Sequence, residues 1–258
     1  MLLTSEREMS LLRAHFTEFS KWAAVITIAA ALKWFYSQAN VNELRWILAP
    51  TKILVEWVTW SNFTFEPWVG YMNREHTFLI AAPCSGVNFL TISFLMLALQ
   101  TLWNARPDPA RWTSIVKSGF LAFLATIVAN TIRISLALQT QDQFAAVDWL
   151  DAEEMHRLQG IIVYFGSLLV LFLLTDDARG QVHVYPKRPR GVLRRSIWPL
   201  SIYYSVTLGI PLINSGFNPG SLFWRHGLVV LLTPLALVAI LSAFRLLKDR
   251  TFPRNSTV

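Results

Sequence analysis

The chain is 258 residues long; 53% of its residues are hydrophobic and only 15% are charged. An ordinary soluble domain carries about 25% charged residues, so this composition excludes a cytosolic globule as well as a disordered or collagen-like chain. The single cysteine excludes a disulfide scaffold. A polytopic membrane protein remains, in which the net charge of +7 indicates basic cytoplasmic loops and no binding of nucleic acid.

Six stretches of the chain are apolar enough, and nearly long enough, for the span of about 20 residues that a membrane-crossing helix requires. They cover residues 22–36, 86–103, 112–138, 156–175, 196–214 and 226–244. Lys33 lies close enough to the end of the first stretch to snorkel. The sequence therefore predicts an all-α fold, a polytopic membrane helix bundle with about six transmembrane helices in a single integral membrane domain.

A tryptophan-rich stretch, residues 45–69, lies between the first two predicted spans. It is interrupted by Pro50, Lys52, Glu56 and Pro67, which favours an interfacial or re-entrant segment over a further span. A crossing here would also invert every later loop, against the distribution of basic residues described next.

The basic residues orient the predicted spans. If both termini are cytoplasmic, the inner segments hold 16 of the 23 Lys and Arg residues; these segments are 1–21, 103–117, 176–195 and 245–258. The outer loop 139–155 contains five acidic residues and no Lys or Arg. This arrangement satisfies the positive-inside rule at every short loop.

Arg133 is the conspicuous ionisable residue within a span, where a charge is costly and usually functional. It lies five residues before the end of the third predicted span, which is about 7–8 Å below the outer helix end at roughly 1.5 Å per residue. Asn130 and Thr126 share its helical face. The alternative is an arginine that snorkels to the headgroups, but a lipid-facing Asn130 would then lack a polar partner.

Cys84 is the only cysteine and lies in the sequence AAPCSG at the outer start of the second span. Pro83 suits the first position of a helix, which predicts Cys84 in the first helical turn. The helix dipole and the free N–H groups there favour a thiolate. Asn88 and Thr91 continue the same face. The alternative is a buried cysteine that packs as a small hydrophobic residue.

Three histidines are predicted on the outer side, namely His76, His156 and His226. His156 begins the fourth span and is followed at i+4 and i+8 by Gly160 and Tyr164. A helix N-terminus favours the neutral imidazole, which can accept a proton. The alternative for each histidine is an interfacial anchor. The predicted topology thus brings a nucleophile, a base and a cation to one membrane face.

Three motifs, in this order, resemble those of the exosortases and archaeosortases, polytopic membrane cysteine transpeptidases. Residues 82–90 (APCSGVNFL) are similar to the family's Cys-Ser-Gly motif, and residues 129–134 (ANTIRI) to its Asn-x-x-Arg-Ile motif. His156 with Gly160 and Tyr164 is similar to its His motif. The resemblance covers about residues 77–175. The chain has fewer N-terminal spans than the eight-helix members, and its last two spans, within residues 196–258, carry no family motif.

The resemblance implies cleavage of exported proteins at a C-terminal sorting signal, which consists of a short motif, a transmembrane helix and an Arg-rich end. It implies Cys84 as the nucleophile, His156 as the general acid and base, and Arg133 as the group that stabilises the oxyanion. The expected partners are this substrate helix and the lipid bilayer. The expected location is the bacterial cytoplasmic membrane, with the active site facing outward. The acceptor, whether an amine, a hydroxyl or water, stays open.

Other functional classes stay open as well. A non-catalytic transporter or channel subunit would use Arg133 and Asn130 to line an anion path, but few polar residues continue that path inward from Thr126. A metalloprotease would need a ligand set such as H-E-x-x-H, which the sequence lacks, so we expect no metal and no cofactor. Ser85 is the alternative nucleophile to Cys84.

Overall fold

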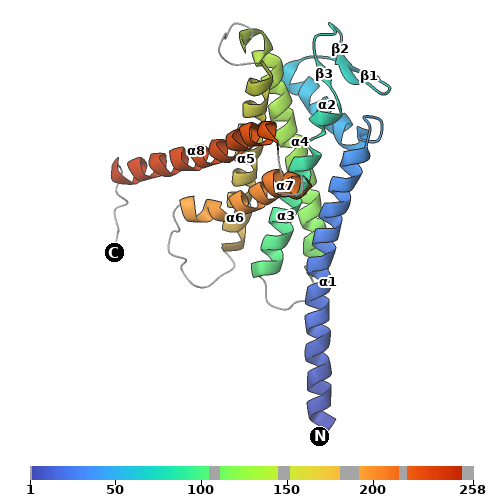
Figure 1. The fold of residues 1–258 in the computed structure, drawn as a ribbon, viewed down its shortest axis with the longest axis vertical. Helices are drawn as coiled ribbons and strands as arrows, with labels where there is room; N and C mark the ends of the chain where they lie inside the picture. The colour runs from blue at the N-terminus through green and yellow to red at the C-terminus, as the bar shows by residue number, and fades with distance from the viewer. Residues whose placement is uncertain (1, 105–110, 145–151, 181–191, 215–219, 252–258) are drawn as a thin grey trace. The chain divides into compact units, whose positions relative to one another are not determined.

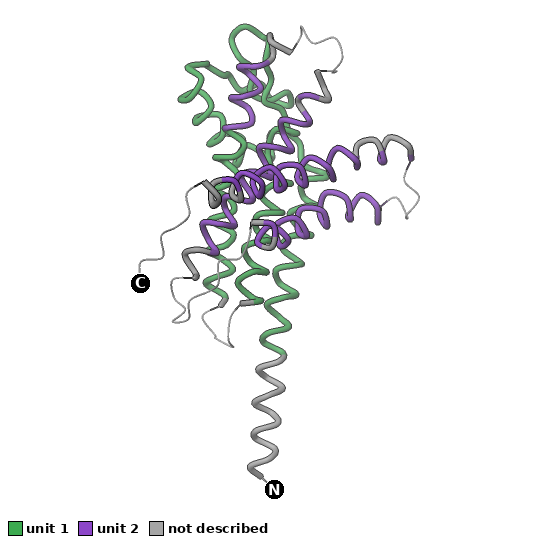
Figure 2. Tube along the Cα trace, turned by 90° about the vertical axis from the view of Figure 1, so that its left-hand side faces the viewer, with its two compact units in different colours: residues 1–131 green, residues 132–258 purple. Residues whose placement is uncertain are grey.

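The structure is a computed structural model, and the residues that it describes are 2–104, 111–144, 152–180, 192–214 and 220–251 (Figure 1). The chain divides into two compact units, residues 1–131 and residues 132–258 (Figure 2). The boundary falls within helix α4 (Arg111–Phe144). Each unit is described separately below.

Five segments of the described chain are long and apolar enough to cross a membrane, so the protein is a helical membrane protein. They are Ala82–Trp103, Trp112–Thr140, Arg157–Asp176, Arg195–Asn214 and Gly227–Phe244, and they coincide with the last five predicted spans. The first predicted span lies in helix α1 (Leu2–Gln38) and is not among these five. Lys21 and Lys33 leave only a short apolar run between them, which explains the difference.

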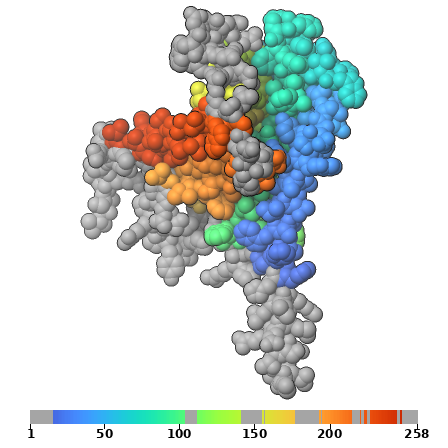
Figure 3. Space-filling model, in the orientation of Figure 1, coloured from blue at the N-terminus to red at the C-terminus, as the bar shows by residue number. Residues whose placement is uncertain are grey.

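In unit 1, α1 packs antiparallel to α3 (Val87–Asn104). The rings of Trp22 and Trp103 meet edge to face, with centroids 6.5 Å apart. At the other end of the pair, the Lys33 ammonium donates a hydrogen bond of 2.6 Å to Oδ1 of Asn88. Figure 3 shows the surface of the described part of α1 and of the segments that follow it, coloured from blue to teal.

Residues 45–80 form a helix and a small sheet. The sequence predicted an all-α protein with an interfacial or re-entrant segment over residues 45–69, and it predicted no strands. Helix α2 (Arg45–Thr59) is followed by β1 (Phe63–Glu66), β2 (Gly70–Asn73) and β3 (Leu79–Ile80), which pair antiparallel in the order β1-β2-β3. Gly70 is required at its position, because its φ is +138° and a Cβ there would lie 2.5 Å from the carbonyl oxygen of Ile80.

Two hydrogen bonds attach this sheet to α2 and the loop before it. Oε1 of Glu56, near the end of α2, accepts a bond of 2.7 Å from the N–H of Phe63, where β1 begins. Oδ1 of Asn42, just before α2, accepts a bond of 3.3 Å from the N–H of Trp68, in the turn between β1 and β2. The sheet is therefore fixed near both ends of the helix.

Unit 2 contains the end of α4, α5 (Ala152–Gly180), α6 (Val192–Tyr204), α7 (Ile210–Asn214) and α8 (Ser221–Thr251). The fifth predicted span is helical throughout, and a π-helical turn over Ser205–Gly209 connects α6 to α7. Helices α5, α6 and α8 pack against one another.

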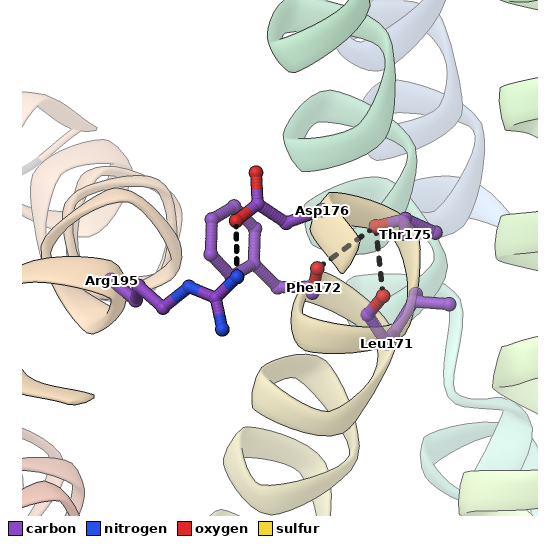
Figure 4. A network of polar contacts seen from close by, with 5 residues as sticks. All are labelled: Leu171, Phe172, Thr175, Asp176 and Arg195. Atoms are coloured by element: carbon purple, nitrogen blue, oxygen red, sulfur yellow. Dashed lines mark hydrogen bonds and ion pairs between the residues drawn. The ribbon is translucent and has the colours of Figure 1, made fainter. Parts of the chain in front are cut away.

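Polar contacts join these helices of unit 2. Arg195 of α6 forms an ion pair of 3.0 Å with Asp176 of α5 (Figure 4). The Tyr204 hydroxyl of α6 donates a bond of 2.7 Å to the carbonyl oxygen of Leu231 in α8. Pro234 lacks the N–H that would bond to the carbonyl of Val230, one residue before Leu231 in the same turn of α8.

Candidate functional site

Cys84 lies in a short 3₁₀ turn, Ala82–Ser85, and not in the first turn of α3 as the sequence predicted. Pro83 occupies an early position of this turn, and the N–H of Cys84 bonds to the carbonyl oxygen of Ala81 at 2.9 Å. The turn ends at Gly86, whose left-handed φ of +71° lets the chain change direction before α3 begins. The side chain of Cys84 is partly exposed.

Gly86 also permits a close approach to α4. A Cβ at this position would lie 3.1 Å from Cγ2 of Thr126 and 3.4 Å from Cγ of Asn130. Both of these α4 residues are fully buried. The absence of a side chain at Gly86 therefore brings the cysteine turn against the polar face of α4.

Asn130 is bonded directly to the cysteine turn. Its side-chain amide Nδ2 donates a hydrogen bond to the main-chain carbonyl oxygen of Cys84. The polar partner that the sequence demanded for Asn130 is therefore a backbone carbonyl of the Cys-Ser-Gly segment. Thr126 lies on the same face, but its hydroxyl bonds to the Ala122 carbonyl of its own helix at 2.7 Å.

Ser85, the alternative nucleophile, is fully buried, with 0% of its surface exposed. Its hydroxyl has no hydrogen-bond partner among the described residues. A nucleophile must reach its substrate and needs a base within hydrogen-bond distance. The partly exposed Cys84 meets the first requirement, and Ser85 does not.

Lys33 is a neighbour of this segment that the sequence did not identify as such. Its ammonium donates a hydrogen bond to Asn88, which lies four residues after Cys84 at the start of α3. Neither side chain is buried. The sequence predicts that this lysine, near the end of a span, snorkels. The structure adds that an amide oxygen of the neighbouring helix accepts a hydrogen bond from it.

In unit 2, Arg133 contacts Gly160 and Tyr164, two residues of the third motif. Its Nη1 donates a hydrogen bond of 3.4 Å to the hydroxyl of Tyr164, and its guanidinium carbon lies 5.4 Å from the centroid of that ring. A Cβ on Gly160 would lie 3.2 Å from Nε of Arg133. The missing side chain at Gly160 therefore lets α5 lie directly against the guanidinium.

The depth of Arg133 along its helix differs from the prediction. Helix α4 continues to Phe144, so Arg133 lies eleven residues before its end, which corresponds to about 16 Å at roughly 1.5 Å per residue. The polar residues after the apolar stretch, such as Gln139 and Gln141, extend the helix. Hydropathy marks where an apolar stretch ends but not where the helix itself ends.

The histidines are placed unequally. His156 lies in α5, one turn before Gly160, and His226 lies in α8, but both side chains are outside the part of the chain that the structure describes. His76 is exposed in the turn between β2 and β3, with a left-handed φ of +53°.

The site residues thus form two groups, one in each unit. Cys84 and Asn130 belong to the first group, and Arg133, Gly160 and Tyr164 to the second; α4 carries Asn130 and Arg133 three residues apart on one helix. Among the described residues, no group of three or more His, Cys, Asp or Glu side chains is placed to hold a metal ion. Comparisons with protein-family models, with curated proteins and with solved structures gave no match.

Proposed function

We propose that this protein is a membrane-embedded cysteine transpeptidase of the exosortase and archaeosortase kind, which cleaves a C-terminal sorting signal of exported proteins. The observation that carries the proposal is the hydrogen bond from the Asn130 amide to the Cys84 carbonyl, since it joins two motifs 46 residues apart. The contacts of Arg133 with Gly160 and Tyr164 join the second motif to the third.

In the proposed reaction, Cys84 attacks the scissile carbonyl carbon of the substrate after His156 has taken the thiol proton. Arg133 neutralises the oxyanion of the tetrahedral intermediate. The C–N bond then breaks, and His156 gives the proton to the leaving amine, which leaves the substrate as a thioester on Cys84. An amine, a hydroxyl or water attacks this thioester in a second tetrahedral step and releases the thiol.

The proposed topology has six spans, of which α1 provides the first, and both termini lie in the cytoplasm. The concentration of Lys and Arg in the inner segments supports this orientation. It turns the Cys84 segment outward, in our proposal at the cytoplasmic membrane of a bacterium. The substrate helix is already in the bilayer, so its scissile bond reaches the enzyme near the outer membrane surface.

The contacts in unit 1 support the enzyme over the transporter or channel subunit. An anion path needs donors that face an open passage, whereas Asn130 is fully buried against the cysteine turn. The hydroxyls of Thr126 and Ser118 bond to carbonyls of their own helix, at 2.7 and 2.8 Å. The donors of these side chains are therefore used within unit 1 and are not directed toward a passage where they could bind an anion.

The test of the nucleophile is mass spectrometry of exported proteins with an apolar, Arg-ended tail, from cells with and without this chain. Cys84→Ala and Cys84→Ser should abolish processing while the protein still accumulates in the membrane. Ser85→Ala is the matched control and should retain processing. Full processing by Cys84→Ala would exclude Cys84 as the nucleophile, and loss in Ser85→Ala with activity in Cys84→Ser would transfer the role to Ser85.

The same assay tests the other two roles. Arg133→Lys should reduce processing severely, by roughly the 10²–10³-fold that loss of an oxyanion donor costs, because lysine lacks the fixed planar fork of arginine. His156→Ala should be inactive, whereas His76→Ala and His226→Ala should be active. An inactive His226→Ala together with an active His156→Ala would assign the base to His226.

A further inference from the structure

Helix α2 has three distinct sides. The first side packs inward and consists of residues that are fully buried in unit 1, namely Ile47, Leu48, Thr51 and Val55. Helix α2 also contacts the 3₁₀ turn that contains Cys84. The position of α2 is therefore coupled to that turn by direct packing.

The second side of α2 is charged, and its charges interact within unit 1. Nζ of Lys52 lies 2.8 Å from Oε2 of Glu56, and the other oxygen of this carboxylate accepts the hydrogen bond from Phe63. The guanidinium carbon of Arg45 lies 4.4 Å from the centroid of the Phe65 ring, which allows a cation–π contact. The charged side thus faces the sheet.

The third side of α2 is apolar and exposed; we name Trp46, Ile53, Leu54 and Trp57 the outer face. These residues recur at i, i+7, i+8 and i+11 and so form one stripe along the helix. Each is exposed, and Trp57 shows 82% of its surface. A contiguous apolar surface of this kind marks a site of interaction.

Two exposed tryptophans, one directly after α2 and one in the turn between β1 and β2, have an unfavourable backbone conformation. Trp60 follows α2 with φ +57° and is 90% exposed, and Trp68 lies in the turn between β1 and β2 with φ +66° and is 76% exposed. A left-handed backbone is unfavourable for a bulky residue, and glycine or asparagine would adopt it more easily. Because the exposed indoles make few packing contacts with the folded chain, this backbone conformation indicates that they interact with something other than the chain itself.

The outer face continues into the surface of a membrane span. Trp46 stacks on Phe123 of α4, with ring centroids 5.8 Å apart and planes at 21°. The same span exposes Phe120, Leu124 and Val128, which in a bilayer contact lipid. The outer face of α2 thus meets α4 within unit 1 at the contact between Trp46 and Phe123.

We infer that the outer face of α2 lies against the acyl chains of the leaflet on the Cys84 side, with Trp60 and Trp68 at the boundary with the headgroups. Tryptophan is enriched at that boundary because its ring is apolar and its N–H is polar. Lipid contact at α2 then sets the depth of the turn that contains Cys84. This inference holds whether or not Cys84 is a nucleophile.

Because the chain has a single cysteine, the Cys84→Ala variant is a cysteine-free background in which labels can be placed at chosen positions. In the Cys84→Ala background, nitroxide labels are placed at Ile53→Cys and Trp57→Cys, and the proteins are reconstituted in vesicles of phosphatidylethanolamine and phosphatidylglycerol. Collision with oxygen, which concentrates among acyl chains, is compared with collision with a water-soluble nickel chelate. Phe120→Cys on α4 is the lipid control, and Glu75→Cys, in the exposed turn between β2 and β3, is the water control.

The oxygen-to-nickel collision ratio at positions 53 and 57 should be close to that at position 120 and several-fold above that at position 75. A ratio like that of position 75 would place the outer face in water and overturn the inference. Low collision with both reagents and an immobilised spectrum would also overturn it, since another protein, a second copy or a substrate helix, would then cover the face. Leu54→Cys gives a further position on the same face if Trp57→Cys does not elute as a single folded species.

Discussion

At the scale of single residues, Asn130 connects stability to the proposed chemistry. Its amide is fully buried, and it supplies a hydrogen bond to the Cys84 carbonyl in the turn that presents the thiol. Polar groups buried in this way are costly when they lose their partner, because water cannot replace it. The same bond therefore stabilises unit 1 and positions Cys84.

Asn130→Ala should lower the free energy of unfolding by about 1–3 kcal/mol, since it leaves the Cys84 carbonyl without this donor. Thermal unfolding of the purified protein in detergent measures the effect. Thr131→Ala is the matched control: Thr131 is buried on the same helix, but its hydroxyl donates a hydrogen bond to the Ile127 carbonyl within α4 and not to another segment of the described chain. Equal losses of unfolding free energy in the two variants would mean that the hydrogen bond from Asn130 to the Cys84 carbonyl does not stabilise the fold more than a bond within one helix.

Single residues also show what the sequence can and cannot predict about the site. The resemblance selected Cys84, Asn130 and Arg133 by their order along the chain, and the structure brings Asn130 to the cysteine turn. The sequence did not reveal that its partner is a main-chain carbonyl. That contact depends on the 3₁₀ turn and on the left-handed φ of Gly86, and neither leaves a periodic pattern.

At the scale of elements, the approach of α5 to α4 depends on Gly160. Gly160→Ala would place a methyl group 3.2 Å from Nε of Arg133, so the guanidinium must move by a few tenths of an ångström. A displacement of about 1 Å at a reacting group can cost on the order of 10² in rate. We therefore expect Gly160→Ala to reduce substrate processing with little change in thermal stability.

The matched control for this prediction is Gly166→Ala, six residues later in the same helix. Its added Cβ would meet only Cδ2 of Leu237, at an ordinary contact distance of 3.9 Å. Alanine favours a helix over glycine by about 1 kcal/mol, so this variant should be at least as stable as the wild type and equally active. Unchanged processing by Gly160→Ala would contradict the prediction, because it would show that the position of the Arg133 guanidinium does not affect the reaction.

The helices differ in how far the sequence could predict them. Helices α3, α4 and α5 follow from long apolar stretches, because a helix satisfies the backbone polar groups of a membrane span within the segment itself. The sheet of residues 63–80 was missed, because its strands have two to four residues and its hydrogen bonds join distant positions such as Tyr71 and Ile80. The helical content of residues 45–59 was hidden by Pro50.

At the scale of the whole molecule, the proposed orientation depends on the charges of the inner segments and has a direct consequence for Cys84. A membrane-impermeant maleimide applied to intact cells should label the wild-type protein, since Cys84 is its only thiol and is partly exposed. In the Cys84→Ala background, Thr113→Cys near the inner end of α4 should react only after the cells are permeabilised. Labelling of Thr113→Cys in intact cells, together with labelling of Cys84 only after permeabilisation, would show that the topology is the inverse of the proposed one.

The central claim is that Cys84 carries the substrate as a thioester, and isolation of that thioester tests it most directly. An exported reporter with a short motif, a transmembrane helix and an Arg-rich end is produced together with this protein, and the Cys84 peptide is analysed by mass spectrometry. We predict a reporter fragment bound to Cys84 that neutral hydroxylamine releases and that is depleted in Arg133→Lys. The account would be contradicted if the reporter were cleaved while the Cys84 thiol stayed unmodified, and if the Cys84→Ala variant cleaved it as well.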